Sequence, residues 1–148
     1  LVFALIARVQ FTWRVVLLPI NIIELYAVTL GLTLIMATLY VYFRDIAHIW
    51  EVLQQVIFYA MPIIYPLSYV TDRGGILATL ARMELLNPFA QTIQDIRHNF
   101  IAPETQPTIW NQFSNPAIKA IPIVLTLLCL GLGVYLFRRN SRRFAEVM

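Results

Sequence analysis

The chain has 148 residues, of which 59% are hydrophobic and 13% are charged, and its mean hydropathy is +0.71. Ordinary soluble domains carry about 25% charged residues, so this composition excludes a water-soluble domain and predicts one membrane domain over residues 1–148. The net charge of +3 comes from basic residues near the ends of apolar segments, which topology explains better than a nucleic-acid partner. The single cysteine, Cys129, excludes an intrachain disulfide and a cysteine-based metal site.

Apolar segments alternate with short polar ones along the chain. Residues 1–7 resemble the end of an earlier span, and because the chain starts within an apolar run we expect an upstream part to be missing. Three later segments have the roughly 20 residues that a spanning helix needs. We predict that these spans, all helical, cover residues 20–43, 46–70 and 117–137.

Basic residues set the expected orientation of these spans. Four arginines crowd the short segment after the last span, and such clusters favour the cytoplasmic side of a membrane. The C-terminus and the turn near residue 44 are therefore expected in the cytoplasm, and the long segment 71–119 outside. The arginines that carry this argument are Arg138, Arg139, Arg142 and Arg143.

The first complete span contains two notable features. Ala27 and Gly31 are four residues apart, a spacing of small residues that lets another helix approach closely. Glu24 lies near the expected outer end, and reaching interfacial water explains it more simply than a role in a transport pathway.

The segment 46–70 carries a polar and aromatic stripe at helical spacing. In hydrocarbon such a stripe must face protein or a hydrated cavity, so one hypothesis is that it lines a translocation path. The alternative is that its charged members occupy the cytoplasmic headgroup layer. Both interpretations stay open, and the candidate path residues are His48, Glu51, Gln55, Tyr59, Pro62 and Tyr69.

Two short amphipathic helices are expected outside the membrane, at 76–86 and 88–101, because neither is long enough to span. Asn87 and Pro88 supply an N-cap and a first-turn proline for the second helix, and the same pair recurs at 115–116 before the final span. Packed back to back, the two helices would form a re-entrant hairpin, which requires burial in protein or a cavity. The candidate functional residues of this external pair are Asn87, Pro88, Asp95 and Arg97.

No catalytic constellation is apparent. The two histidines, His48 and His98, fall on opposite sides of the predicted membrane, and no glycine-rich phosphate loop of the GxxxxGK[ST] type is present. We therefore expect a transport subunit rather than an enzyme, with no catalytic residue, metal or cofactor of its own, that takes energy from a partner or a gradient.

Three motifs point to a family: YVYFRDIAHIW at 40–50, LNPFAQTIQDIR at 86–97 and FRRNSRRFAEV at 137–147. Together they resemble the membrane subunit of ABC-2 type exporters, in the branch that exports polysaccharides and polyol phosphates. The resemblance implies six spans, of which this chain holds the end of the third and spans four to six, with a re-entrant helix pair outside. It also implies that Phe43, Arg44 and Asp45 form a cytoplasmic turn after span four. Our own hypothesis for Arg44 and Asp45 is a local ion pair or cap that fixes this turn, and simple anchoring of the topology is the open alternative.

Further expectations follow from the resemblance. The permease pairs with a second copy of itself and with ATP-binding cassette subunits that hold ATP and Mg²⁺, in a bacterial inner membrane. Its substrate is a lipid-linked glycan such as O-antigen, capsule or a teichoic-acid-like polymer, and the main docking surface for the ATPase lies upstream of this chain. The alternatives are an ABC-2 exporter of drugs or small hydrophobic molecules and, with less support, a gradient-driven transporter. Against the latter, the spans hold no buried acidic relay.

Overall fold

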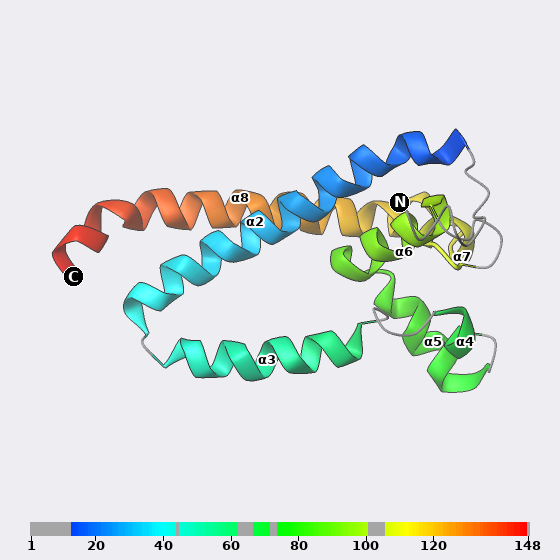
Figure 1. Ribbon diagram of the computed structural model, residues 1–148, viewed down its shortest axis with the longest axis horizontal. Helices are drawn as coiled ribbons and strands as arrows, with labels where there is room; N and C mark the ends of the chain where they lie inside the picture. Colours follow the sequence, from blue (N-terminus) through cyan, green and yellow to red (C-terminus); the bar gives the residue numbers. More distant parts are fainter. Residues whose placement is uncertain (1–12, 44, 62–66, 72–73, 101–105, 148) are drawn as a thin grey trace, which may run out of the picture.

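The computed structural model describes residues 13–43, 45–61, 67–71, 74–100 and 106–147, and within these ranges all regular structure is helical. A short 3-10 helix, η1 (Trp13–Leu17), leads into α2 (Leu18–Tyr42). Helix α2 packs extensively against the C-terminal helix α8 (Pro116–Val147). The helices between residues 68 and 112 gather at one end of this pair, and the C-terminus lies at the other (Figure 1). The predicted all-helical class is confirmed for these ranges.

Two helical segments are long and apolar enough to cross a membrane. They run over Trp13–Tyr42 and Pro116–Ser141 and coincide with the predicted spans 20–43 and 117–137. Helix α8 continues beyond residue 137, so the backbone of the arginine-rich segment is helical too. These two helices form the long axis of the molecule.

The expected third span is divided in the structure. Helix α3 (Ile46–Ala60) has 15 residues and a length of about 22 Å, which falls short of the roughly 30 Å hydrocarbon core. Met61 is extended, at φ −75° and ψ 145°, as expected for a residue that precedes proline. Helix α3 therefore ends before Pro62, and α4 (Ser68–Thr71) is a separate helix. A membrane span over 46–70 stays a prediction.

The predicted helix starts are confirmed. The side-chain oxygen of Asn87 accepts a hydrogen bond from the backbone N–H of Phe89 at 3.1 Å, at the start of α6 (Pro88–Phe100). Asn115 does the same for Ala117 at 2.9 Å, at the start of α8. In both cases proline is the first helical residue, where its missing N–H costs nothing.

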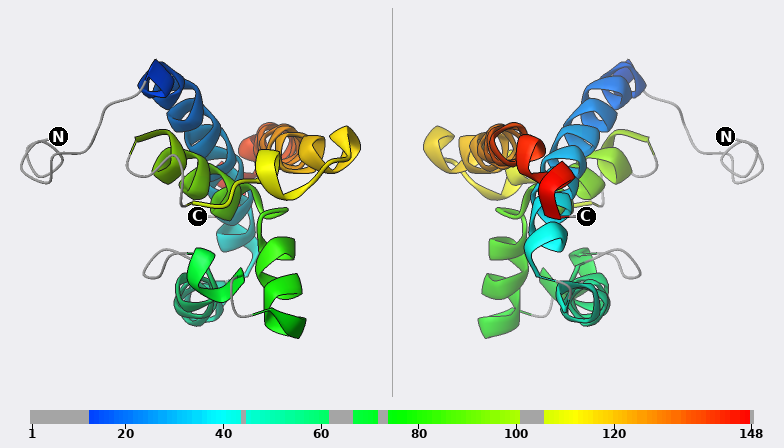
Figure 2. Two further views of the ribbon diagram at one scale, coloured as in Figure 1. Left: turned by 90° about the vertical axis from the view of Figure 1, so that its right-hand side faces the viewer. Right: turned by 90° about the vertical axis from the view of Figure 1, so that its left-hand side faces the viewer.

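Helices α5 (Gly75–Glu84) and α6 pack on different partners. Helix α5 lies on α4, with which it shares a small apolar core, whereas α6 lies on α2 and α8 (Figure 2). The two short helices therefore do not pack extensively on each other, and the re-entrant hairpin stays a prediction. The small core also includes α7 (Ile109–Gln112), and its members are Leu67, Ala81, Leu85 and Ile109.

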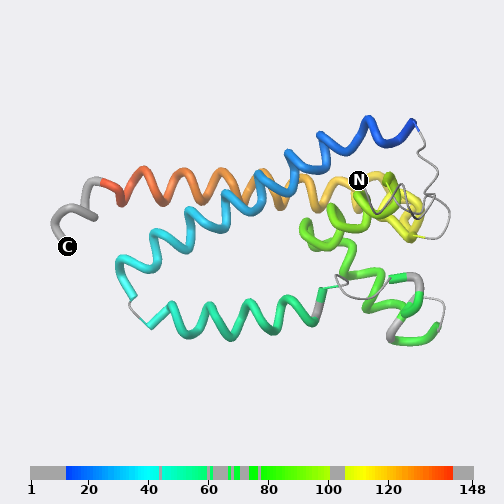
Figure 3. Tube along the Cα trace, viewed as in Figure 1, coloured from blue at the N-terminus to red at the C-terminus, as the bar shows by residue number. Residues whose placement is uncertain are grey.

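Helices α2 and α8 meet in direct backbone contact where they cross (Figure 3). A Cβ atom added to Gly133 of α8 would lie 2.4 Å from the carbonyl oxygen of Gly31, and one added to Gly31 would lie 2.6 Å from the backbone nitrogen of Leu130. No residue larger than glycine fits either position without moving a helix. The close approach predicted from the small residues of α2 is thus confirmed at Gly31, and the approaching helix is α8.

Candidate functional site

The turn between α2 and α3 is held by backbone hydrogen bonds. The N–H of Phe43 donates to the carbonyl of Leu39 at 2.9 Å, and the N–H of Ile46 donates to the carbonyl of Phe43 at 3.2 Å. The side chain of Asp45 makes no capping hydrogen bond to α3, so the predicted capping role of Asp45 is wrong. Arg44 lies outside the described residues, and its ion pair with Asp45 stays a prediction.

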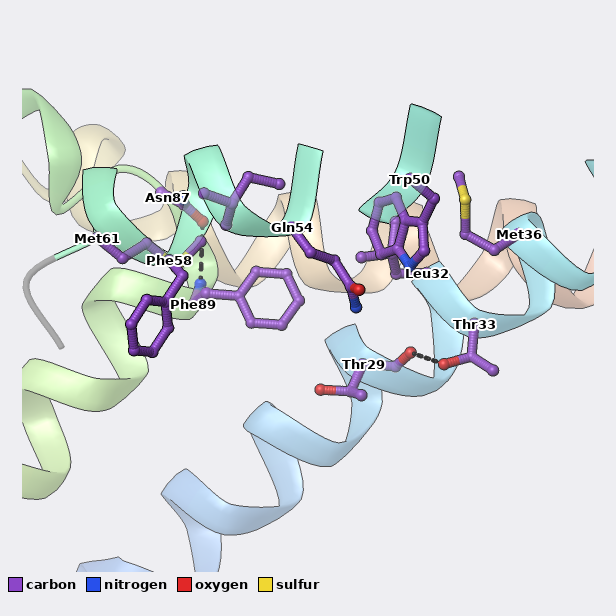
Figure 4. A pocket seen from close by; sticks show the side chains of 11 residues that line it. Thr29, Leu32, Thr33, Met36, Trp50, Gln54, Phe58, Met61, Asn87 and Phe89 are labelled. Atoms are coloured by element: carbon purple, nitrogen blue, oxygen red, sulfur yellow. Dashed lines mark hydrogen bonds between the residues drawn. The ribbon is translucent and has the colours of Figure 1, made fainter. Parts of the chain in front are cut away.

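An open space of about 670 Å³, here called the apolar cavity, separates α3 from α2. The space forms because α2 packs closely on α8 but makes few contacts with α3. The start of α6 closes one end of it (Figure 4). The residues that line the apolar cavity are Thr29, Leu32, Thr33, Met36, Trp50, Gln54, Ile57, Phe58, Met61, Asn87 and Phe89.

The polar groups of the apolar cavity are few. The hydroxyls of Thr29 and Thr33 donate to backbone carbonyls one turn earlier in α2, at 2.7 and 2.8 Å. Gln54 extends from α3 toward α2, between the rings of Trp50 and Phe58 (Figure 4). The cavity therefore offers aromatic and aliphatic surface with one amide directed into it, a combination that suits an amphipathic ligand.

The predicted path residues do not line this cavity. His48, Glu51, Gln55 and Tyr59 are exposed on α3, with 72% of Tyr59 accessible. Tyr69 is exposed on α4, and Pro62 lies outside the described residues. The structure does not bring these side chains together, and their role in a path stays a prediction.

The cavity-facing side of α3 was missed by sequence reasoning. It presents Trp50, Gln54 and Ile57, which recur at intervals of four and three residues and so share one helical face. Met61 lines the cavity from just beyond the end of the helix. The signal was the pair Trp50 and Gln54, an aromatic ring and an amide one turn apart.

A second hollow of about 450 Å³, here called the polar pocket, lies at the end of the α2–α8 pair opposite the C-terminus. It is formed by η1, the first turns of α2, the polar side of α6, the segment around α7 and one residue of α8. Its lining residues are Trp13, Arg14, Leu17, Ile20, Asn21, Glu24, Gln91, Asp95, His98, Asn99, Thr108, Trp110, Asn111 and Ile123.

The polar side of α6 is turned inward to form this pocket. The amide of Gln91 donates to Asp95 Oδ2 at 2.5 Å, and Trp110 Nε1 donates to the same oxygen at 3.1 Å. Asn99 donates to the side-chain oxygen of Asn21 at 3.1 Å, which links α6 to α2. Buried polar groups need such partners, and these bonds fix α6 against the first turns of α2.

Asp95 is the most buried carboxylate of the polar pocket, with 4% of its surface exposed. Burial raises its pKa to about 6, although the hydrogen bonds from Trp110 and Gln91 act in the opposite direction. Sequence analysis named Asp95 from its position on the amphipathic helix, and the structure places it at the centre of the hydrogen-bonded cluster. The side chain of Arg97 is half-buried on the same helix, and its function stays a prediction.

His98 lies at one side of the pocket between two defined partners. Arg14 donates a hydrogen bond to His98 Nε2 at 2.5 Å, so Nε2 is an acceptor and carries no proton. The proton is therefore on Nδ1, which donates to the carbonyl of Gln106 at 3.2 Å. Burial lowers the pKa of His98, the charge of Arg14 lowers it further, and the Gln106 carbonyl opposes both. The imidazole is therefore neutral here. Among the residues that the structure describes, no group of three metal-ligating side chains is present.

Comparison with known proteins identifies a relative. In an alignment of 138 positions that covers 91% of this chain, the sequence is 33% identical to the O-antigen export system permease protein RfbA of Myxococcus xanthus. The match covers 47% of that protein, so the chain spans about half the length of the curated relative it matches. No family model and no solved structure matches the chain. The relationship to RfbA confirms the predicted resemblance to membrane subunits of ABC-2 polysaccharide exporters.

Proposed function

We propose that this chain is part of the membrane-spanning permease subunit of an ATP-driven ABC exporter of lipid-linked polysaccharide. The observation that carries the proposal is the relationship to an O-antigen export permease over nearly the whole chain. Two helices of membrane-spanning length and composition support it. On this proposal the chain is a transport subunit, and ATP and Mg²⁺ bind to a separate ATP-binding cassette subunit.

The apolar cavity fits one wall of a path for such a substrate. Aromatic side chains stack on sugar rings without fixing their position, and aliphatic ones suit a polyprenyl carrier. Trp50, Phe58 and Phe89 supply the first kind of surface, and Leu32 and Met36 supply the second. The amide of Gln54 is available for hydroxyl groups that pass.

The opposite face of α3 supports a dimer. Glu51, Gln55 and Tyr59 are exposed, and exposed polar groups at membrane depth must face protein or water. A second copy of the permease would cover this stripe and enclose a hydrated path between the two copies. The predicted path residues would then act at the contact between copies.

The orientation follows from the charge at the end of α8. Arg138 and Arg139 are exposed there, and Tyr42 donates to the side chain of Asn140 at 2.8 Å, which ties the end of α2 to the same region. A cytoplasmic location for this end satisfies the positive-inside rule. Helices α5 and α6 then lie at the outer face of a bacterial inner membrane.

The apolar cavity also favours one competing function. Its volume of about 670 Å³ lies in the range of about 300–1,000 Å³ that is usual for small-molecule sites. An ABC-2 exporter of drugs or small hydrophobic molecules would use the same space. A gradient-driven transporter is the weaker alternative, because neither long span presents a chain of acidic residues in the described ranges.

Purification with a candidate ATP-binding subunit tests the proposal. The gene for this permease is co-expressed with an adjacent ATP-binding gene, and the ATPase activity of the purified complex is measured with added lipid-linked glycan. We expect a stable complex whose activity the glycan changes. A complex that responds to small hydrophobic compounds and ignores glycan would favour drug export, and the absence of any complex would contradict an ABC permease.

A further inference from the structure

The polar pocket contains hydrogen-bond acceptors that the described chain leaves without a partner. They are Glu24 Oε1, Gln91 Oε1 and Asp95 Oδ1, each with almost no exposed surface. As residues, Gln91 and Asp95 are only 2% and 4% exposed. A buried acceptor without a donor is unfavourable, so three of them around one hollow indicate a site that is completed by donor groups from a ligand.

The chemistry of the ligand follows from this set. Three acceptors require a molecule with several hydrogen-bond donors. The carboxylates of Glu24 and Asp95 disfavour a phosphate or another anion, and the guanidinium of Arg14 in the same lining disfavours a cation. Beside them stand the indole rings of Trp110, half exposed, and Trp13, 74% exposed, both in the pocket lining. A pyranose satisfies both the acceptors and the indole rings, because it carries hydroxyl groups at its edge and C–H groups on its faces.

The acceptors and the rings are held in fixed positions. Trp110 donates to Asp95 Oδ2 and Gln91 donates to the same atom, so the other oxygen, Oδ1, is left for a ligand. The pocket volume of about 450 Å³ suits a small ligand. The pocket belongs to α2 and α6 together, and it is separate from the apolar cavity, with which it shares no lining residue.

We propose that the polar pocket binds one neutral pyranose unit, whose hydroxyl groups donate to Glu24, Gln91 and Asp95 while its face packs on Trp110. The choice of a sugar unit from the exported glycan rests on the proposed function. In the orientation proposed above, the pocket lies at the outer end of the path. It would hold a sugar of the emerging chain between α2 and α6.

Direct binding of simple sugars tests this proposal without transport. The permease is reconstituted in lipid nanodiscs and titrated with the methyl glycosides of glucose, galactose, mannose and rhamnose, and binding is followed by saturation-transfer NMR. We expect at least one glycoside to bind. The variants Asp95→Asn and Glu24→Gln each remove a charged acceptor, so each should bind the glycoside about tenfold to a hundredfold more weakly than the parent protein.

The variants separate a binding role from a structural one. Asp95→Asn keeps the size of the side chain and removes a buried charge, so its thermal stability should match or exceed that of the parent. Glu84→Gln is the matched control, because Glu84 is a partly buried carboxylate on α5 that lines neither hollow; it should leave the affinity unchanged.

Two results would overturn the inference: no glycoside binds the parent protein, or affinities are equal in the parent, Asp95→Asn and Glu24→Gln. Failure of the inference can be told from failure of the proposed function. A glycan-responsive complex with the ATP-binding subunit, combined with no sugar binding, would remove the pocket assignment alone. Sugar binding that depends on Asp95, with no such complex, would support the site and contradict the exporter.

Discussion

The crossing of α2 and α8 should not tolerate a methyl group at Gly133. In the variant Gly133→Ala the new Cβ would lie 2.4 Å from the carbonyl oxygen of Gly31, whereas carbon–oxygen contacts normally start at about 3.3 Å. The obstacle is backbone, which no rotamer change can relieve, so the helices must separate by about 1 Å. Such a gap forfeits about a quarter to a half of the dispersion energy of the contacts around it.

The expected loss of stability is about 1–3 kcal/mol, the usual cost of overpacking a tight contact. The measurement is the unfolding free energy in mixed micelles, from titration with a denaturing detergent and the change in helical circular dichroism. Gly131→Ala, on the same helix, is the matched control, because its Cβ would meet no atom within 4 Å. Alanine favours a helix over glycine by up to about 1 kcal/mol at either position, so Gly133→Ala should be about 1–3 kcal/mol less stable than Gly131→Ala. Equal stability of the two variants would refute direct backbone contact at the crossing.

Three further predictions concern other parts of the molecule. Asp95 has a pKa of about 6 against an ordinary 3.8, so its contribution to stability is complete only below the ordinary value and is lost as the pH rises through 6. Chemical unfolding between pH 3 and 8 should show a fall of about 3 kcal/mol relative to Asp95→Asn, and parallel curves would contradict the burial. Alanine variants of Asn21 and Asn99, alone and together, should give a coupling energy of about 0.6 kcal/mol and at most about 1.7, while strictly additive losses would disprove the hydrogen bond. Tyr59→Ala should slow export of surface glycan without lowering the thermal transition, because Tyr59 is exposed; unchanged export would remove it from the path.

Much of the fold could be predicted because its signals are local. The asparagine-proline pairs fix the starts of α6 and α8 through side-chain bonds to the next turn, and such bonds depend only on neighbouring residues. Gly31 correctly indicated a close helix approach, yet its partner Gly133 could not be deduced, because the pairing of two distant helices leaves no mark at a single position. The end of α3 at Ala60 also has a local cause, because a proline at position 62 restricts the backbone of Met61 directly before it.

The candidate sites were harder to predict because they depend on which face of a helix is covered. On α3 a path along the stripe with Glu51 and Gln55 was one of two open hypotheses, while the structure opens a cavity on the side of Trp50 and Gln54. On α6 the polar residues were named as candidates, but the helix that buries them could not be deduced: they lie against α2 around Asp95. Periodicity identifies both faces of a helix but does not say which neighbour each face receives.

Loss of the gene is the most direct test of polysaccharide export. In a strain that lacks this permease, surface polysaccharide is measured by immunostaining of intact cells, and lipid-linked glycan is extracted from the membrane fraction and quantified. We expect surface polysaccharide to disappear while lipid-linked glycan accumulates inside the cell. The intact gene should return both quantities to their normal levels. Normal surface polysaccharide in the deletion strain, with no accumulated intermediate, would contradict it.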